Sequence, residues 1–119
     1  MAMTAQELVA NAKQQIKEID TATAQGQLAD SLILDVREPA EFAAGHLPGA
    51  VNIPRGLLEF KIDTQPEFQG QRQAPIVVYC QTGGRSALAT QVLNQLGYEG
   101  AVSMAGGFKA WAESGLLLG

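Results

Sequence analysis

The sequence contains a single cysteine, Cys80, and a single histidine, His46, among its 119 residues. One cysteine cannot form an intramolecular disulfide, and no Cys-x-x-Cys pair is present. Structural zinc sites and thioredoxin-like redox chemistry are therefore excluded, and we expect neither a metal nor a cofactor. The lack of disulfides favours a reducing, cytoplasmic location.

Long apolar segments and clusters of basic residues are also missing. No apolar run approaches the roughly 20 residues that cross a bilayer, and the N-terminus lacks the features of a signal peptide. The net charge of −4 is spread without blocks of one sign, unlike the clustered Lys and Arg of a nucleic-acid surface. We expect partners other than membranes and nucleic acids. The 46% hydrophobic and 17% charged content is typical of one soluble globular domain.

Short apolar strands alternate with helical segments along the chain. Strands are predicted at residues 31–37, 50–54, 76–79 and 100–104. Helices are predicted at residues 5–17, within 21–29, and at 40–44, 56–62, 86–96 and 108–113. Residues 16–20 fit either the end of the first helix or a short edge strand, and residues 63–74 are predicted to form an exposed loop. This order predicts an α/β fold with a mostly parallel sheet and helices on both faces.

The predicted core of the longest helices follows from apolar spacing. Leu88, Val92 and Leu96 recur every four residues, with Ala89 and Leu93 beside them, which predicts a core stripe on the helix at 86–96. Phe108 and Trp111 are predicted to be core residues on the last helix.

The apolar strand at 76–79 leads directly to Cys80, and a glycine-containing turn and a helix follow it. A strand, a tight turn and a helix N-terminus together point backbone N–H groups at the sulfur, which favours the thiolate. Gly83 and Gly84 permit the positive φ values that such a turn requires. We therefore expect Cys80 to be a nucleophile that needs no separate general base.

Arg85 is the fifth residue after Cys80 and the only charged residue between positions 73 and 98. A cysteine-dependent phosphatase needs its arginine one place further on, in a loop that surrounds a phosphate. The shorter loop is predicted to be too tight for that anion, but able to hold one sulfur atom. With no partner nearby in the sequence, Arg85 is expected to be available to a thiolate, a persulfide or an anionic substrate.

Four segments resemble, in order, the signatures of the single-domain rhodanese (thiosulfate sulfurtransferase-like) family. They are Leu34-Asp-Val-Arg-Glu38 with Glu41-Phe42, the segment Gly45-His-Leu-Pro-Gly-Ala-Val-Asn-Ile-Pro54, the loop Val78-Tyr-Cys-Gln-Thr-Gly-Gly-Arg-Ser86, and Gly106-Gly107 with Trp111. The resemblance covers residues 16–115. It predicts a rhodanese-like domain at 16–119, with five strands in its sheet, after an N-terminal helical extension at 1–15.

The resemblance implies a ping-pong sulfur transfer. Cys80 would take a sulfane sulfur from thiosulfate or a persulfide such as glutathione persulfide, carry it as a persulfide, and pass it to a thiol or cyanide. Backbone N–H groups of the loop would stabilise the persulfide, and its arginine would aid anion capture. The loop residues are Gln81, Thr82, Gly83, Gly84, Arg85 and Ser86.

Other polar residues at strand ends have supporting roles in this interpretation. Because the carboxyl ends of parallel strands meet at one edge, Asp35, Arg37, Arg55 and Cys80 are expected to share that edge. Asp35 is predicted to be buried, and to hold the loop or Arg37. Arg37 and Arg55 fit either the rim of the pocket or surface ion pairs, and His46 is predicted to fix its turn by a hydrogen bond.

Two other functions are compatible with the same fold. A phosphatase or arsenate reductase is disfavoured by the position of the arginine and by the lack of auxiliary cysteines. A sulfur-carrier or partner-binding module, serving a sulfur-relay protein with little turnover of small molecules, is the other alternative. Turnover of an aryl phosphate, or capture of a persulfide-donating partner without thiosulfate activity, would distinguish them.

Overall fold

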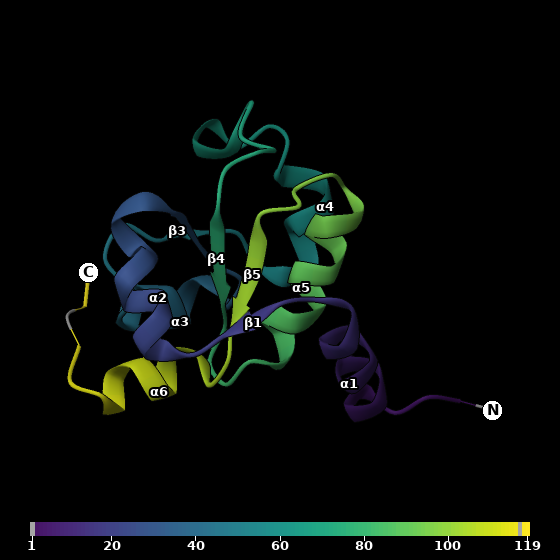
Figure 1. The fold of residues 1–119 in the computed structure, drawn as a ribbon, viewed down its shortest axis with the longest axis horizontal. Coiled ribbons are helices and arrows are strands. Elements are labelled where there is room, and N and C mark those ends of the chain that lie inside the picture. Colours follow the sequence, from purple (N-terminus) through teal and green to yellow (C-terminus); the bar gives the residue numbers. More distant parts are fainter. Residues whose placement is uncertain (1, 117) are drawn as a thin grey trace.

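The computed structural model describes residues 2–116 and 118–119, which form a central sheet covered by helices (Figure 1). The sheet has five strands in the order β1-β5-β4-β2-β3, and every pairing is parallel. Its strands are β1 (Glu18–Ile19), β2 (Leu32–Asp35), β3 (Val51–Asn52), β4 (Ile76–Tyr79) and β5 (Ala101–Met104). The predicted α/β fold with a five-stranded sheet is confirmed. The undecided segment at 16–20 contains the edge strand β1.

Helices lie on both faces of this sheet (Figure 1). They are α1 (Ala5–Gln15), α2 (Thr21–Gln27), α3 (Pro39–Ala44), α4 (Leu58–Lys61), α5 (Gly84–Gln95) and α6 (Gly107–Glu113). The described residues also form short 3-10 turns at Leu28–Asp30, Arg55–Leu57 and Pro66–Phe68. None of the helices in the described residues has the length and apolar character that a membrane crossing requires.

The two faces of the sheet bury separate apolar cores because neighbouring residues of a strand point to opposite sides. On one face, Leu34 and Val78 pack with residues of α4 and α5. On the other face, Ile33 and Val77 pack with residues of α2 and α6. A strand buried on both faces reads as a continuous apolar run, which is why β2 and β4 were recognisable in the sequence. Asp35 is paired with Tyr79, so these two strands end side by side.

The predicted stripe on α5 is wrong. Leu88, Val92 and Leu96 are only half-buried, although Leu96 packs against the edge of the core. The buried residues are Ser86, Ala87, Ala89, Thr90 and Leu93. Small side chains let the helix lie close to the sheet, while α1 packs against α5 from another direction. The helix is therefore covered on more than one side, and Leu93 is the large apolar residue that lies on its most buried face.

Two other burial predictions have different outcomes. The segment at 63–74 is not simply an exposed loop, because Phe68 lies in a 3-10 turn and is fully buried in the core beside α4. Trp111 is buried as predicted, and Phe108 is partly buried against the same core.

Candidate active site

The loop from Cys80 to Ser86 joins the end of β4 to the start of α5, and it lies at the lower end of the sheet in Figure 1. The backbone N–H groups of Gly83 and Ser86 donate to the Sγ atom of Cys80 at 3.1 and 3.3 Å. Gly83 has φ +113°, a conformation that a residue with a side chain rarely adopts. Cys80 is only 1% exposed. Converging N–H donors and the start of α5 favour negative charge on this sulfur.

The hydroxyl groups of Ser86 and Ser103 extend the polar contacts of the sulfur into the core. The Ser86 hydroxyl lies 3.5 Å from the Cys80 sulfur and 3.2 Å from the carbonyl oxygen of Gly83. It also lies 2.9 Å from the hydroxyl of Ser103 on β5. Sequence reasoning missed Ser103. Its only signal was a polar residue within an otherwise apolar predicted strand.

The first turn of α6 is joined to the loop by backbone hydrogen bonds. The backbone N–H groups of Phe108 and Lys109 donate to the carbonyl oxygens of Cys80 and Gln81 at 2.8 and 3.0 Å. Gly107 permits this approach, since a Cβ atom there would lie 2.5 Å from the Cys80 oxygen and 2.6 Å from the Gln81 oxygen. The glycine pair at 106–107 is thus part of the loop's support.

Asp35 and Arg37 form a buried ion pair beside the loop. Asp35 is fully buried and Arg37 is 2% exposed, and the closest nitrogen–oxygen distance between them is 2.7 Å. Burial alone disfavours the guanidinium charge, but the hydrogen bonds and charge of Asp35 outweigh it and raise the pKa of Arg37. The ring of Phe108 lies 4.4 Å from the Arg37 guanidinium carbon.

The two terminal nitrogens of Arg37 also connect the pair to other segments. One donates to the Gly45 carbonyl oxygen at 2.7 Å, and another to the side-chain oxygen of Gln81 at 3.3 Å. Neither location predicted for Arg37 is correct, since it lies in the interior and not at a rim or a surface ion pair. Asp35 does hold Arg37, which in turn holds the loop residue Gln81.

The sequence led us to expect an unpaired Arg85, but the structure gives it a partner. Its guanidinium group donates to both carboxylate oxygens of Glu41 on α3, at 2.8 and 3.1 Å. These hydrogen bonds lower the pKa of Glu41 to about 2. Because 44 positions separate the two residues, no local pattern in the sequence revealed the pair. The two side chains are 38% and 34% exposed, so the pair remains open to solvent.

The other predicted residues lie at the margins of the loop. Thr82 is exposed. The Arg55 side chain pairs with Glu59 at 2.9 Å and, within the described residues, makes no hydrogen bond to the loop. His46 fixes its turn through a 3.0 Å contact between its Nδ1 atom and the Phe42 carbonyl oxygen. The expected common edge therefore includes Asp35, Arg37 and Cys80, but the side chain of Arg55 pairs elsewhere.

An apolar groove of about 400 Å³ adjoins the loop on the side of α1. The loop contributes Gly84 to the lining of this groove, and Val9 of α1 lies next to Gly84. The other lining residues, all on α1, are Ala5, Gln6, Ala10 and Lys13. The helix is held at its start by a capping box between Thr4 and Glu7. The groove is therefore a preformed surface beside the loop that carries Cys80.

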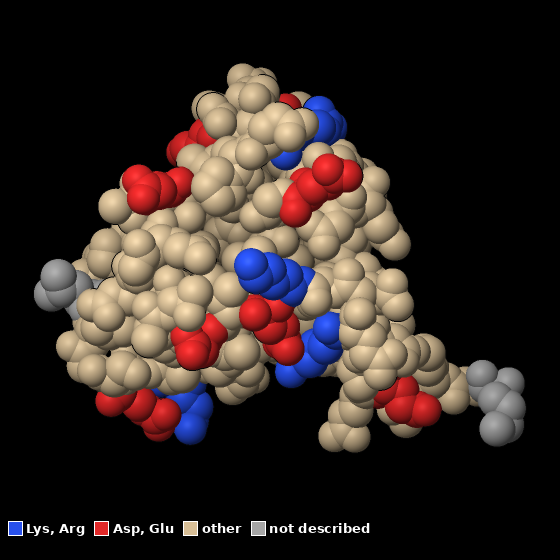
Figure 2. All heavy atoms as spheres, viewed as in Figure 1, with Lys and Arg blue, Asp and Glu red and all other residues tan. Residues whose placement is uncertain are grey.

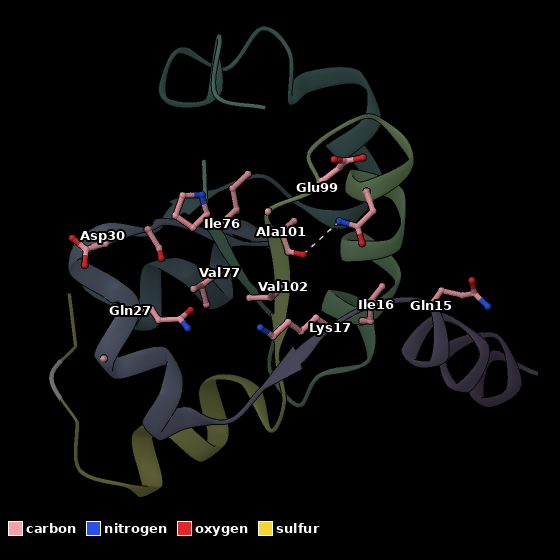
Figure 3. Close-up of a pocket in the computed structure, with 15 residues that line it drawn as sticks. Gln15, Ile16, Lys17, Gln27, Asp30, Ile76, Val77, Glu99, Ala101 and Val102 are labelled. Atoms are coloured by element: carbon pink, nitrogen blue, oxygen red, sulfur yellow. Dashed lines mark hydrogen bonds between the residues drawn. The ribbon is translucent and has the colours of Figure 1, made fainter. Parts of the chain in front are cut away.

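A separate pocket of about 480 Å³ lies at the opposite ends of β4 and β5 (Figure 3). Val77 and Val102 line it, together with Lys17 and Asp30. Because Cys80 follows the last residue of β4, this pocket is not part of the candidate site. On the face shown in Figure 2, basic and acidic side chains are interspersed, with no large patch of one sign.

Comparison with known proteins places these features in a family context. Residues 11–114 match the Rhodanese-like domain family. A sulfurtransferase of Allochromatium vinosum is 36% identical, over 85% of this chain and 92% of its own. The human thiosulfate:glutathione sulfurtransferase is 40% identical, over 68% and 78%. A solved structure from Rhodopseudomonas palustris, a protein of unknown function described as a possible tyrosine phosphatase, has a TM-score of 0.88 and 32% identity, covering 100% of this chain and 96% of its own.

Proposed function

Because this chain belongs to the rhodanese-like domain family, we propose that it is a sulfurtransferase that carries a sulfane sulfur on Cys80. The observation that supports this most directly is the pair of backbone N–H groups that donate to the Cys80 sulfur. A cysteine sulfur that accepts two backbone N–H donors at the start of a helix can act as a nucleophile without a separate general base. Relatives named as sulfurtransferases support the same class of reaction.

The reaction has two displacement steps. The Cys80 thiolate attacks the outer sulfur of thiosulfate, the S–S bond of the donor breaks, and sulfite leaves with the electron pair. Cys80 then carries a persulfide, whose terminal sulfur is anionic and accepts N–H donors of the loop. A thiolate or cyanide attacks that terminal sulfur, the Cys80–sulfur bond breaks, and the thiolate is restored. The products of this second step are an organic persulfide or thiocyanate.

Burial of the sulfur supports sulfur transfer over phosphoryl transfer. Cys80 is 1% exposed and two N–H donors already lie within 3.3 Å of its sulfur. Such a site suits the addition of a single atom, whereas a phosphate needs donors around several oxygens.

The apolar groove beside Gly84 supports donors and acceptors that carry an organic group. We propose thiosulfate and organic persulfides such as glutathione persulfide as donors, and thiols or cyanide as acceptors. The carbon body of an organic persulfide would lie against Val9 of α1 while its terminal sulfur meets Cys80. Thiosulfate has no such body, so the groove would contribute nothing to its binding.

Mass spectrometry of the intact protein tests the proposal. After incubation with thiosulfate or glutathione persulfide, we expect the mass to increase by one sulfur atom and to return to its starting value after cyanide is added. Cys80→Ser should gain no sulfur, whereas the exposed loop variant Thr82→Ala should still gain it. Absence of a mass increase with every sulfane donor would refute the proposal. Turnover of an aryl phosphate under the same conditions would indicate a phosphatase instead.

A further inference from the structure

Two serine hydroxyls lie behind the Cys80 sulfur where the surrounding core is apolar. Ser86 on α5 and Ser103 on β5 are both fully buried, and their oxygens are 2.9 Å apart. Ser103 is paired in the sheet with Val78, so it lies beside the central strand β4. A buried hydroxyl costs stability unless it is hydrogen-bonded, so both protons in this pair need an acceptor.

The acceptor available to each proton determines its direction. Among the residues that the structure describes, Ser86 is the only hydrogen-bond partner of the Ser103 hydroxyl. Ser103 must therefore donate to Ser86, because the opposite direction would leave the Ser103 proton without an acceptor. The Ser86 proton then has two possible acceptors, the Gly83 carbonyl oxygen at 3.2 Å and the Cys80 sulfur at 3.5 Å.

The choice between these acceptors depends on the charge of the sulfur. A neutral Cys80 thiol donates to the Ser86 oxygen, and Ser86 donates to Gly83, so each group is satisfied. When the sulfur is a thiolate it becomes the stronger acceptor, and a rotation of the Ser86 hydroxyl turns its proton to the sulfur. Ser103 donates to Ser86 in both states, and this polarises the Ser86 hydroxyl and strengthens its bond to the anion.

We propose that Ser103 is a positioning residue for sulfur transfer, which acts through Ser86 to stabilise the Cys80 thiolate. This inference rests on the proposed function. It assigns a role in that reaction to a strand residue outside the loop. Ser103 touches neither the sulfur nor a substrate in this arrangement. It holds Ser86 in the orientation from which the hydroxyl can change acceptor when the charge of the sulfur changes between the steps of the cycle.

The test measures the thiolate itself, together with sulfur transfer. In Ser103→Ala we expect the ultraviolet absorbance of the thiolate at neutral pH to decrease. We also expect alkylation of Cys80 by iodoacetamide to slow about twofold, since loss of a polarising neighbour weakens a hydrogen bond by roughly 10–30%. Persulfide formation from thiosulfate should slow by the same factor. Thr90→Val removes another fully buried hydroxyl of α5 that has no bond to this pair, and it should leave all three measurements unchanged.

A double-mutant cycle separates this role from a general effect on packing. If Ser103 acts through Ser86, then Ser103→Ala should have no further effect on alkylation in a Ser86→Ala background. An equal effect in both backgrounds would overturn the inference, as would unchanged thiolate absorbance in Ser103→Ala. Absorbance and alkylation require no sulfur donor. A decrease in both, in a protein that takes up no sulfur, would therefore support the Ser103 contact and refute the proposed function alone.

Discussion

Gly107→Ala should destabilise the active loop without altering any residue of that loop. The new Cβ atom would lie 2.5 Å from the Cys80 carbonyl oxygen and 2.6 Å from the Gln81 carbonyl oxygen. Both oxygens belong to backbone and accept hydrogen bonds from α6, so neither can move aside cheaply. The φ of +60° at this position adds a second cost, because it lies in the left-handed region.

The two costs can be estimated separately. A left-handed backbone costs a residue with a Cβ atom about 1–2 kcal/mol. Overpacking against a well-ordered interior adds about 1–3 kcal/mol. We therefore expect Gly107→Ala to lower the free energy of unfolding by roughly 2–5 kcal/mol, a large share of the 5–15 kcal/mol typical of a domain.

Gly70→Ala provides a matched control. Gly70 has φ +72°, and nothing lies within 4 Å of a Cβ atom built on it, so this variant carries only the backbone cost. Urea unfolding of both variants gives their difference, which should be about 1–3 kcal/mol. Alkylation of Cys80 should slow in Gly107→Ala and stay unchanged in the control. Equal destabilisation of the two variants would refute the reasoning about the contact between α6 and the loop.

Further predictions concern three positions in and beside the site, namely Asp35, Glu41 and Val9. Asp35→Asn leaves Arg37 buried without its counter-charge, so urea unfolding should show a free energy of unfolding lower by about 3–5 kcal/mol. A decrease of less than about 1 kcal/mol would mean that the pair behaves as an exposed one. Glu41→Gln releases the loop arginine and should lower the KM for thiosulfate by about two- to fivefold, the range of a partly exposed ion pair, whereas an unchanged KM would contradict its availability to anions. The pKa of Glu41 is lowered from 4.5 to about 2, so its stabilising contribution is complete above pH 4.5 and is lost as the pH falls toward 2. Acid unfolding of wild type and Glu41→Gln should therefore converge in that range and stay a constant distance apart above it. Val9→Gln should lower kcat/KM for glutathione persulfide but not for thiosulfate. The control Leu8→Gln, at a 48% exposed position on the same helix, should change neither value. Equal losses with both donors would exclude a role of the groove in binding the organic group.

The fold was predictable because the sequence features that indicate it each lie within a short stretch of the chain. The apolar runs of β2 and β4 and the glycine turn after Cys80 each lie within a few residues. The parallel order of the sheet then brought Asp35 and Cys80 to one edge, as expected. The loop after β4 was predicted from the spacing between one cysteine, two glycines and one arginine.

Contacts between distant segments were not predictable in the same way. The partner of Arg85 is 44 residues away on α3, and nothing near either residue marks the pair. The buried position of Arg37 was missed because a strand end reads equally well as surface. The core stripe of α5 was centred on Leu88, Val92 and Leu96, whereas the fully buried residues are their neighbours Ala89 and Leu93.

The outer strands of the sheet are very short. β1 and β3 have two residues each, whereas the three inner strands have four residues each. An exposed strand edge offers unpaired N–H and C=O groups to other chains, and the number of such groups grows with its length. Here that number is close to its minimum. Charged residues add to this protection at one edge, because Glu18 lies in β1 and Lys17 and Asp20 border it.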